Sequence, residues 1–209
     1  MTIKAVAFDY GGVISLPQDK KAMEDLARMA GIDTPLMQRM YWDLRPVYDQ
    51  GLVNGGEFYR NILAGMGIFP DSAVIEQMVE RDLESWSRIN PGTEQLMKKV
   101  KQEGLKLGVL SNMIQPFLDR ARKTIPLFDL PDRAVYSCEA GVVKPGEKIY
   151  RLLLEALDCR GEELVFFDDL EPNVRAAEKL GIHGYLWKDP AAAYTELKRL
   201  CPDRFKDPT

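Results

Sequence analysis

The stretch of sequence that decides the fold is residues 3–13, Ile3-Lys4-Ala5-Val6-Ala7-Phe8-Asp9-Tyr10-Gly11-Gly12-Val13. Its first half is a nearly continuous apolar run, which is typical of a strand buried on both faces of a parallel sheet. Ligands of open α/β sheets bind beyond the carboxyl ends of the strands, so Asp9 is predicted to lie at a ligand site. The glycines allow the close backbone approach that a small bound anion needs. Taken alone, the stretch is equally compatible with an ordinary turn that Asp9 caps.

Four further apolar runs follow along the chain, at residues 105–110, 134–136, 164–167 and 184–187. Helical patterns separate most of them, so five strands of a doubly wound parallel α/β sheet are predicted. The gap after the first strand is about 90 residues long, far more than one crossover helix needs. We therefore predict an inserted small helical cap at residues 15–87. Residues 1–14 and 88–209 are predicted to form the α/β core domain.

The second and third runs are followed by groups that can contact an anion. Ser111 and Asn112 end the second run and can donate hydrogen bonds to phosphate oxygens, although both residues are also common helix N-caps. Lys144 precedes Pro145, which holds the stretch extended. A lone lysine of this kind is more often on a solvated surface than in a site.

The fourth run ends in Asp168 and Asp169, with Asn173 four residues beyond the second acid. Adjacent carboxylates repel each other unless a cation or a lysine neutralises them. This pair is therefore the predicted metal-binding end of the site. The alternative is that Asp169 caps the helix that follows.

All four polar groups fall at the same edge of the predicted sheet, in the order acid, hydroxyl, lysine, acid pair. In this respect the sequence resembles the haloacid dehalogenase-like hydrolase superfamily, whose four motifs match residues 9–13, 111–112, 144–145 and 167–173. The resemblance implies a Rossmann-like core with a C1 helical cap, as in subfamily I, and points to the phosphatase-like branch. It implies a phosphatase that hydrolyses a small phosphorylated metabolite, with a sugar phosphate as one candidate.

The resemblance assigns a role to each matching residue. Asp9 is implied to be the nucleophile, which forms an aspartyl-phosphate that water hydrolyses. The implied ligands of a Mg²⁺ cofactor are Asp9, the backbone carbonyl of Gly11, and Asp169, with Asn173 supporting the site and Asp168 lying behind it near Lys144. Lys144 and Ser111 are implied to be catalytic. The implied phosphate-binding groups are Gly11, Gly12, Ser111, Asn112 and Lys144.

One position departs from the family pattern. Phosphatases of this kind usually carry a second aspartate two residues after the nucleophile, as general acid and base, and Gly11 stands there. Loss of a general acid typically costs ~10²- to 10⁴-fold in rate. Either water or a cap residue replaces it, or the substrate has a good leaving group, such as an anomeric sugar oxygen, or catalysis is weak. We favour the good leaving group.

Two other functions stay open at this level. A weakly active relative that binds phosphate for regulation is compatible with Gly11. A dehalogenase-like hydrolase is the second alternative. The dehalogenases of this family carry a tyrosine at the position of Gly11 and need no metal, whereas Tyr10 lies one residue earlier. The acid pair therefore favours phosphoryl chemistry.

Within the predicted cap, residues 41–45 (Tyr-Trp-Asp-Leu-Arg) are expected to reach the substrate. Arg45 could bind an anion and the aromatic rings could stack on a substrate. The alternative is a helix that packs its aromatic side chains inward and leaves Arg45 on the surface.

Composition narrows the class of partner. With 28 Lys and Arg against 32 Asp and Glu the net charge is −4, which does not favour binding to nucleic acid or to an anionic membrane.

The three cysteines lack paired spacing, as expected of reduced thiols. No apolar run reaches the ~20 residues of a membrane span, and no signal peptide is recognised. We expect a cytoplasmic monomer or homodimer that binds a small phosphorylated substrate.

Overall fold

The centre of the molecule is a five-stranded sheet in the order β3-β2-β1-β4-β5. The computed structural model describes residues 2–206, so residues 1 and 207–209 of the predicted core segments lie outside it. Every neighbouring pair of strands is parallel, which confirms the predicted α/β fold. The strands are β1 (Ala5–Phe8), β2 (Lys106–Ser111), β3 (Arg133–Tyr136), β4 (Leu164–Asp168) and β5 (His183–Leu186).

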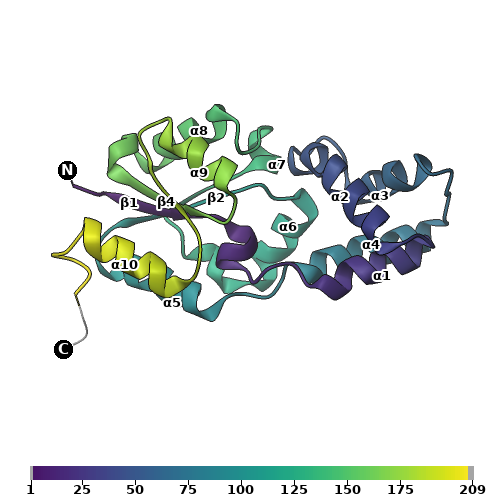
Figure 1. Cartoon of the computed structure of the whole chain (residues 1–209), viewed down its shortest axis with the longest axis horizontal. Coiled ribbons are helices and arrows are strands. Elements are labelled where there is room, and N and C mark those ends of the chain that lie inside the picture. The colour runs from purple at the N-terminus through teal and green to yellow at the C-terminus, as the bar shows by residue number, and fades with distance from the viewer. Residues whose placement is uncertain (1, 207–209) are drawn as a thin grey trace.

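Helices cover both faces of this sheet (Figure 1). Helices α8 (Glu147–Leu157) and α9 (Glu171–Glu178) lie over one face, and α5 (Pro91–Gln102) and α10 (Pro190–Leu200) lie over the other. Successive residues of β1 point to opposite faces and join two separate apolar clusters. This double burial is the reason that the strand is apolar without alternation. The other helical elements of this part include α6 (Gln115–Thr124), α7 (Ser137–Ala140) and single 3-10 turns at Pro126–Asp129 and Gly161–Glu163.

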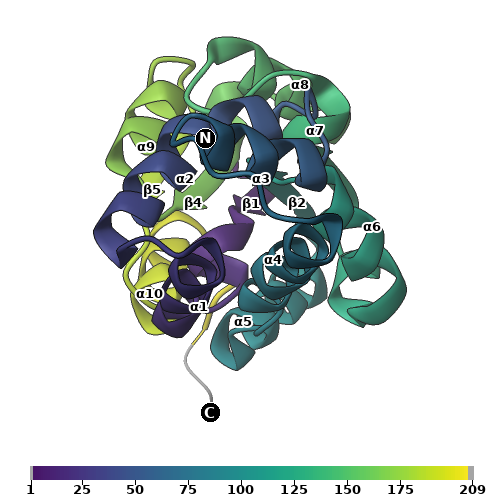
Figure 2. The ribbon, with the colours of Figure 1, turned by 90° about the vertical axis from the view of Figure 1, so that its right-hand side faces the viewer.

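Four helices between β1 and α5 form a second group beyond the carboxyl edge of the sheet, and Figure 2 looks onto them. They are α1 (Lys20–Ala30), α2 (Thr34–Asp49), α3 (Gly55–Ala64) and α4 (Ser72–Ser85). Each begins at a residue whose side chain accepts a backbone hydrogen bond, which satisfies donors that a helix start leaves free. These N-caps are Asp19, Asp33, Asn54 and Asp71. The predicted helical content is confirmed, while the division into core and cap domains stays a prediction.

The chain enters and leaves this helical group at one place. Ser15 and Ile89 form an isolated antiparallel bridge. Beside it, the Leu16 amide donates to the Arg88 carbonyl at 2.8 Å. The predicted boundaries at 14/15 and 87/88 fall at this pair of linkers.

A membrane span needs about 20 predominantly apolar residues in one helix. Within residues 2–206, no helix has both the length and the apolar composition to cross a membrane.

Candidate active site

Three carboxylates meet at the carboxyl edge of the sheet, between β1 and β4. Asp9 follows β1, Asp168 ends β4 and Asp169 comes next. Because β1 and β4 run parallel and in register, the residues that follow them emerge side by side. One carboxylate oxygen from each of the three lies within 4.8 Å of the others. The structure thus brings together the acids that the sequence placed at this edge.

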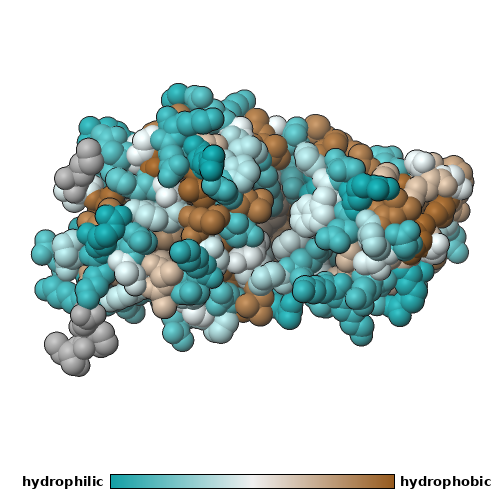
Figure 3. Space-filling model, in the orientation of Figure 1, coloured by the Kyte–Doolittle hydropathy of each residue, from teal (hydrophilic) through white to brown (hydrophobic). Residues whose placement is uncertain are grey.

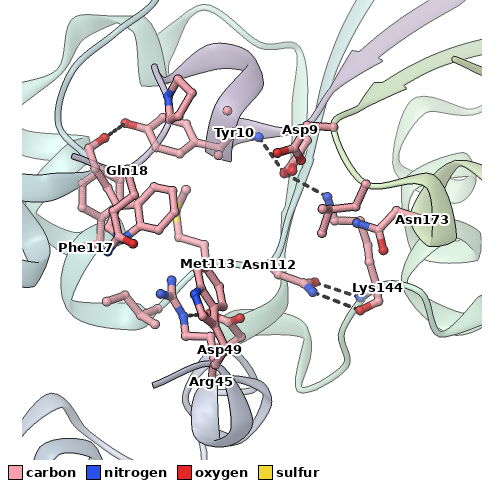
Figure 4. A pocket seen from close by; sticks show the side chains of 18 residues that line it. Asp9, Tyr10, Gln18, Arg45, Asp49, Asn112, Met113, Phe117, Lys144 and Asn173 are labelled. Atoms are coloured by element: carbon pink, nitrogen blue, oxygen red, sulfur yellow. Dashed lines mark hydrogen bonds and ion pairs between the residues drawn. The ribbon is translucent and has the colours of Figure 1, made fainter. Parts of the chain in front are cut away.

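A buried lysine, Lys144, lies among these carboxylates, and Figure 4 shows it beside Asp9. Lys144 Nζ is 2.8 Å from Asp9 Oδ1 and 2.6 Å from Asp168 Oδ2. Its side chain is only 1% exposed, so the ion pairs are shielded from water. Asn112 fixes the lysine backbone, because its amide oxygen accepts from Lys144 N at 2.8 Å and its amide nitrogen donates to Lys144 O at 3.0 Å. Both the backbone and the ammonium group of Lys144 are therefore fixed by polar contacts.

Asp168 uses both of its oxygens within the protein. Oδ2 pairs with Lys144, and Oδ1 accepts from the Leu170 amide and from Asn173 Nδ2, both at 2.9 Å. Its side chain is fully buried. Asp168 therefore orients the lysine, and the two carboxylates left to bind a ligand are Asp9 and Asp169. Asn173 contributes to the site by donating a hydrogen bond that fixes the orientation of Asp168.

Burial makes the two remaining carboxylates costly to ionise. It raises the pKa of Asp9 to about 7, and Lys144 offsets only part of that rise while the neighbouring acids add to it. Burial also raises the pKa of Asp169 to about 6, and the charge of Asp168 adds to the rise. Additional positive charge at this place would stabilise both groups in their ionised form.

The donor set fits Mg²⁺ as that additional charge. Lys144 and the Tyr10 amide both contact Oδ1 of Asp9, which leaves Oδ2 for a ligand. Carboxylate and carbonyl oxygens are the protein ligands that Mg²⁺ prefers. Asp9 and Asp169 provide the first kind, and the loop after β1 provides backbone carbonyls. The place of the Gly11 carbonyl among the ligands stays a prediction.

The loop after β1 requires glycine at residue 12. Gly12 has φ +72°, and a Cβ atom there would lie 2.7 Å from Oδ2 of Asp169. A side chain at this position is therefore strained and would also displace a carboxylate of the site. Glycine here permits the loop after β1 to lie close to the Asp169 side chain.

We expect Gly12→Ala to weaken Mg²⁺ binding by ~10- to 100-fold, the scale seen when a metal ligand loses its support. The control is Gly31→Ala, which has a similar φ of +69° and no atom within 4 Å of the added Cβ. Calorimetric titration of both variants with Mg²⁺ separates backbone strain from the loss of Asp169. Equal Mg²⁺ affinities in the two variants would contradict the assigned geometry.

A cavity of ≈430 Å³ opens beside these residues, at the hollow between the sheet and the helical group (Figure 3). The predicted site residues that line it are Asp9, Gly11, Gly12, Arg45, Asn112, Lys144, Asp169 and Asn173. Ser111 and Asp168 do not line it. Ser111 lies at the same edge of the sheet, but it is buried and its hydroxyl is 3.4 Å from the Asn112 carbonyl. Its contact with phosphate stays a prediction.

Arg45 lies on the other side of the cavity from Asp9 (Figure 4) and is buried. Its Nε is 2.7 Å from Asp49 Oδ1, one helical turn further along α2, and its guanidinium also contacts the Tyr41 hydroxyl. Burial opposes its charge, but Asp49 keeps the pKa of Arg45 above its ordinary value. Surface exposure, one alternative for this residue, is therefore wrong. Because Asp49 already neutralises Arg45, anion binding by Arg45 stays a prediction that the geometry weakens.

Trp42, from the segment 41–45 that was expected to reach the substrate, lines the cavity, but the sequence did not point to the other aromatic and aliphatic side chains of the lining. Trp86 lies over Gly11, where an added Cβ would be 3.3 Å from its ring. Leu170 follows the acid pair, lines the cavity and is 55% exposed. That exposure could not be known from the sequence. The other unpredicted apolar residues of the lining are Pro17, Met113, Ile114 and Phe117.

Comparison with known proteins gives one matching family and several relatives. A model described as haloacid dehalogenase-like hydrolase matches residues 3–181. The chain is 28% identical to phosphatase MT3486 of Mycobacterium tuberculosis, over 89% of this chain and 88% of that protein. It is 25% identical to the sesquiterpene phosphatase astK of Aspergillus oryzae, over 95% of this chain and 97% of that protein.

Solved structures share the fold. The HAD family enzyme bt-2542 from Bacteroides thetaiotaomicron has a TM-score of 0.75 at 22% identity, covering 90% of this chain and 95% of that one. The L-2-haloacid dehalogenase of Xanthobacter autotrophicus has a TM-score of 0.65 at 20% identity, covering 100% of this chain and 91% of that one. Fold likeness at this level of identity includes a dehalogenase, so the chemistry of this chain has to be argued from the site.

Proposed function

The chain belongs to the haloacid dehalogenase-like hydrolases, and from that premise we propose that it is a Mg²⁺-dependent phosphomonoesterase acting on a small phosphorylated metabolite. The observation that carries the proposal is the cluster of buried Asp9 and Lys144 with the more exposed Asp169, in which two carboxylates with raised pKa face one cavity. Relatives named as phosphatases support it. A structure of the Bacteroides enzyme is a complex with magnesium and inorganic phosphate. An enzyme with this fold can therefore bind Mg²⁺, which supports Mg²⁺ as the proposed metal.

In this proposal Asp9 is the nucleophile. Its free oxygen forms a bond to phosphorus while the bond from phosphorus to the leaving oxygen breaks, which gives an aspartyl-phosphate that water then hydrolyses. Lys144, held in place by Asp168 and Asn112, reduces the repulsion between the Asp9 carboxylate and the phosphate dianion. That repulsion is ~4 kcal/mol for each pair of unit charges at 4 Å and an effective ε of 20. When bound by Asp9, Asp169 and the Gly11 carbonyl, Mg²⁺ would supply two further positive charges.

We also propose that residues 15–87 act as a cap over a core of residues 1–14 and 88–209. The two segments that connect the core and the cap lie side by side and pair at Ser15 and Ile89. The cavity has lining residues from both, such as Trp42 from α2 and Asn112 after β2. A cap that closes over the phosphate would exclude water from the site.

The proposal predicts metal-dependent release of phosphate. With p-nitrophenyl phosphate we expect turnover in the presence of Mg²⁺, loss of turnover with excess chelator, and recovery when Mg²⁺ is returned, because the carboxylates need the added charge. The measurement is phosphate release over time. Chloride release from 2-chloropropionate is measured in parallel, and metal-independent dehalogenation without phosphatase activity would support the alternative chemistry.

The missing general acid gives a second prediction. The ring of Trp86 fills the space beside Gly11, so we expect Gly11→Asp alone to leave the hydrolysis of alkyl phosphates no faster. Combined with Trp86→Ala, which opens that space, the same aspartate is expected to raise kcat on an alkyl phosphate by up to ~100-fold. Trp86→Ala alone is the control. A gain in the single Gly11→Asp variant would show that the ring does not exclude the acid.

A further inference from the structure

We propose that the natural substrate is an aryl phosphate, a phosphomonoester whose leaving oxygen is attached to an aromatic ring. The inference deepens the proposed function and rests on it, because it names the group that occupies the cavity beyond the phosphate. Two independent observations carry it: the chemical character of the cavity wall, and the absence of a general acid beside the nucleophile.

The cavity is divided into a charged side and an apolar side. Figure 4 shows Asp9, Lys144 and Asn173 on one side and Phe117 on the other. The apolar lining comes from parts of the chain that are far apart in the sequence. Its main members are Trp42, Trp86, Met113, Ile114, Phe117 and Leu170. A phosphate seated at Asp9 would therefore direct its organic group toward aromatic and aliphatic side chains.

Part of this apolar surface is open to water in the free protein. Trp42 is 46% exposed and Leu170 is 55% exposed, although both line the cavity. An apolar group that covers these side chains on binding removes this surface from water, which is favourable. Trp42 and Trp86 already stand at right angles, 6.5 Å apart, with the Arg45 guanidinium within 5.7 Å of both rings. The two tryptophan rings on the apolar side of the cavity are therefore already in place before the ligand binds.

Three polar side chains on this side of the cavity, those of Arg45, Gln18 and Tyr10, already have partners. Arg45 is paired with Asp49 at 2.7 Å, and Gln18 Nε2 donates to the Ser85 hydroxyl at 3.1 Å. The Tyr10 hydroxyl donates to the Trp86 carbonyl at 3.0 Å. The hydroxyl groups of a sugar would lose their water here and find few free partners, which is unfavourable. The wall therefore favours an apolar organic group over the sugar that the sequence left as a candidate.

The leaving group must also depart without a proton from the enzyme. Gly11 stands where the family acid would be, and the Trp86 ring covers it. In the first step the Asp9 oxygen bonds to phosphorus, the bond from phosphorus to the phenolic oxygen breaks, and its electron pair stays on that oxygen. A phenolate has a conjugate acid pKa of about 10, as in tyrosine. It can therefore leave unprotonated and take its proton from water. An alkoxide leaves poorly, because the pKa of its conjugate acid is far higher and close to that of water.

Four substrates separate the two parts of the inference. Two of them have an apolar organic group: 1-naphthyl phosphate, whose leaving group is good, and 2-cyclohexylethyl phosphate, whose leaving group is poor. The other two carry a polar sugar: glucose 1-phosphate, whose leaving group is good, and glucose 6-phosphate, whose leaving group is poor. With Mg²⁺ present, we expect 1-naphthyl phosphate to have the highest kcat/KM. We expect its kcat to exceed that of the cyclohexylethyl ester at least ~100-fold, the scale of a missing general acid. We expect its KM to be ~10-fold below that of glucose 1-phosphate.

Variants of α2 test the wall itself. We expect Trp42→Ala to raise the KM for 1-naphthyl phosphate ~10-fold and to change kcat much less, because Trp42 contacts the organic group and not the phosphorus. Trp42→Phe is expected to restore most of the affinity. Val47→Ala is the matched control, since Val47 is on the same helix, is exposed and lies outside the cavity lining.

The outcomes distinguish this inference from the proposed function. A kcat/KM for glucose 1-phosphate equal to or above that for 1-naphthyl phosphate would overturn the inference and leave the phosphatase proposal intact. If none of the four esters is hydrolysed, the phosphatase proposal fails. Calorimetric titration of the Asp9→Asn variant with 1-naphthyl phosphate and with glucose 1-phosphate then decides the inference, which requires tighter binding of the aromatic ester.

Discussion

Replacing Asp9 by asparagine is expected to reduce phosphate release by at least ~10⁴-fold, the scale for loss of a covalent nucleophile. The amide is a poor nucleophile, but its oxygen can still accept the hydrogen bonds that Lys144 and the Tyr10 amide give to Oδ1 of Asp9. The fold and the phosphate site are therefore expected to persist. The measurement is kcat with p-nitrophenyl phosphate and Mg²⁺, together with the thermal unfolding midpoint.

The matched control is Asp158→Asn. Asp158 is 97% exposed and has φ +49°, a conformation that asparagine tolerates, so the same chemical change is made away from the site. This variant is expected to keep the rate of the unaltered protein. If Asp9→Asn kept more than about a hundredth of that rate, far above the loss expected of a missing nucleophile, Asp9 would not be the nucleophile.

The second large effect is expected from Lys144→Met, which keeps the length of the side chain and removes its charge. Lys144 contacts Asp9, Asp168 and the Leu110 carbonyl while almost fully buried. Removing one partner of a buried ion pair leaves the others without compensation and typically costs about 3–5 kcal/mol of unfolding free energy. Phosphatase activity is expected to fall as well, because the positive charge beside the nucleophile is lost. Urea unfolding with chelator present measures the first effect, and kcat measures the second.

Lys179→Met serves as its control. Lys179 is exposed at the end of α9 and lies outside the cavity lining. Its replacement is expected to change the unfolding free energy by less than about 0.5 kcal/mol. If Lys144→Met were no less stable than this control, Lys144 would not be the group that compensates the buried carboxylates.

The sheet could be predicted almost completely from the sequence. Each of the five apolar runs contains a strand in the structure, and the ends of these strands differ from the ends of the runs by at most two residues. The reason is physical for the centre of the sheet, because a parallel strand covered on both faces is apolar throughout, as β1 is, and few other elements have that pattern. The edge strands β3 and β5 are only partly buried and were found from shorter apolar runs. The order β3-β2-β1-β4-β5 could not be read in the same way, since it depends on which strands pair.

The charged side of the site was predictable for a related reason. Parallel strands all present their carboxyl ends at one edge, so Asp9, Lys144 and Asp169 could be expected together although they are far apart along the chain. The detailed partners could not be expected. Only the structure shows that Asn112 holds the lysine backbone through two hydrogen bonds and that Ser111 lies outside the cavity lining.

What the sequence by itself determined is therefore the parallel sheet and the chemistry at its edge, because both follow from local pattern and from the common direction of the strands. What only the tertiary structure decided is the other side of the cavity. Trp86, Phe117 and Leu170 have the same residue types as core positions, and nothing local distinguishes them. Whether such a side chain is buried in the core or lines a cavity depends on how helices from distant segments pack, and that is decided only when the whole chain is folded.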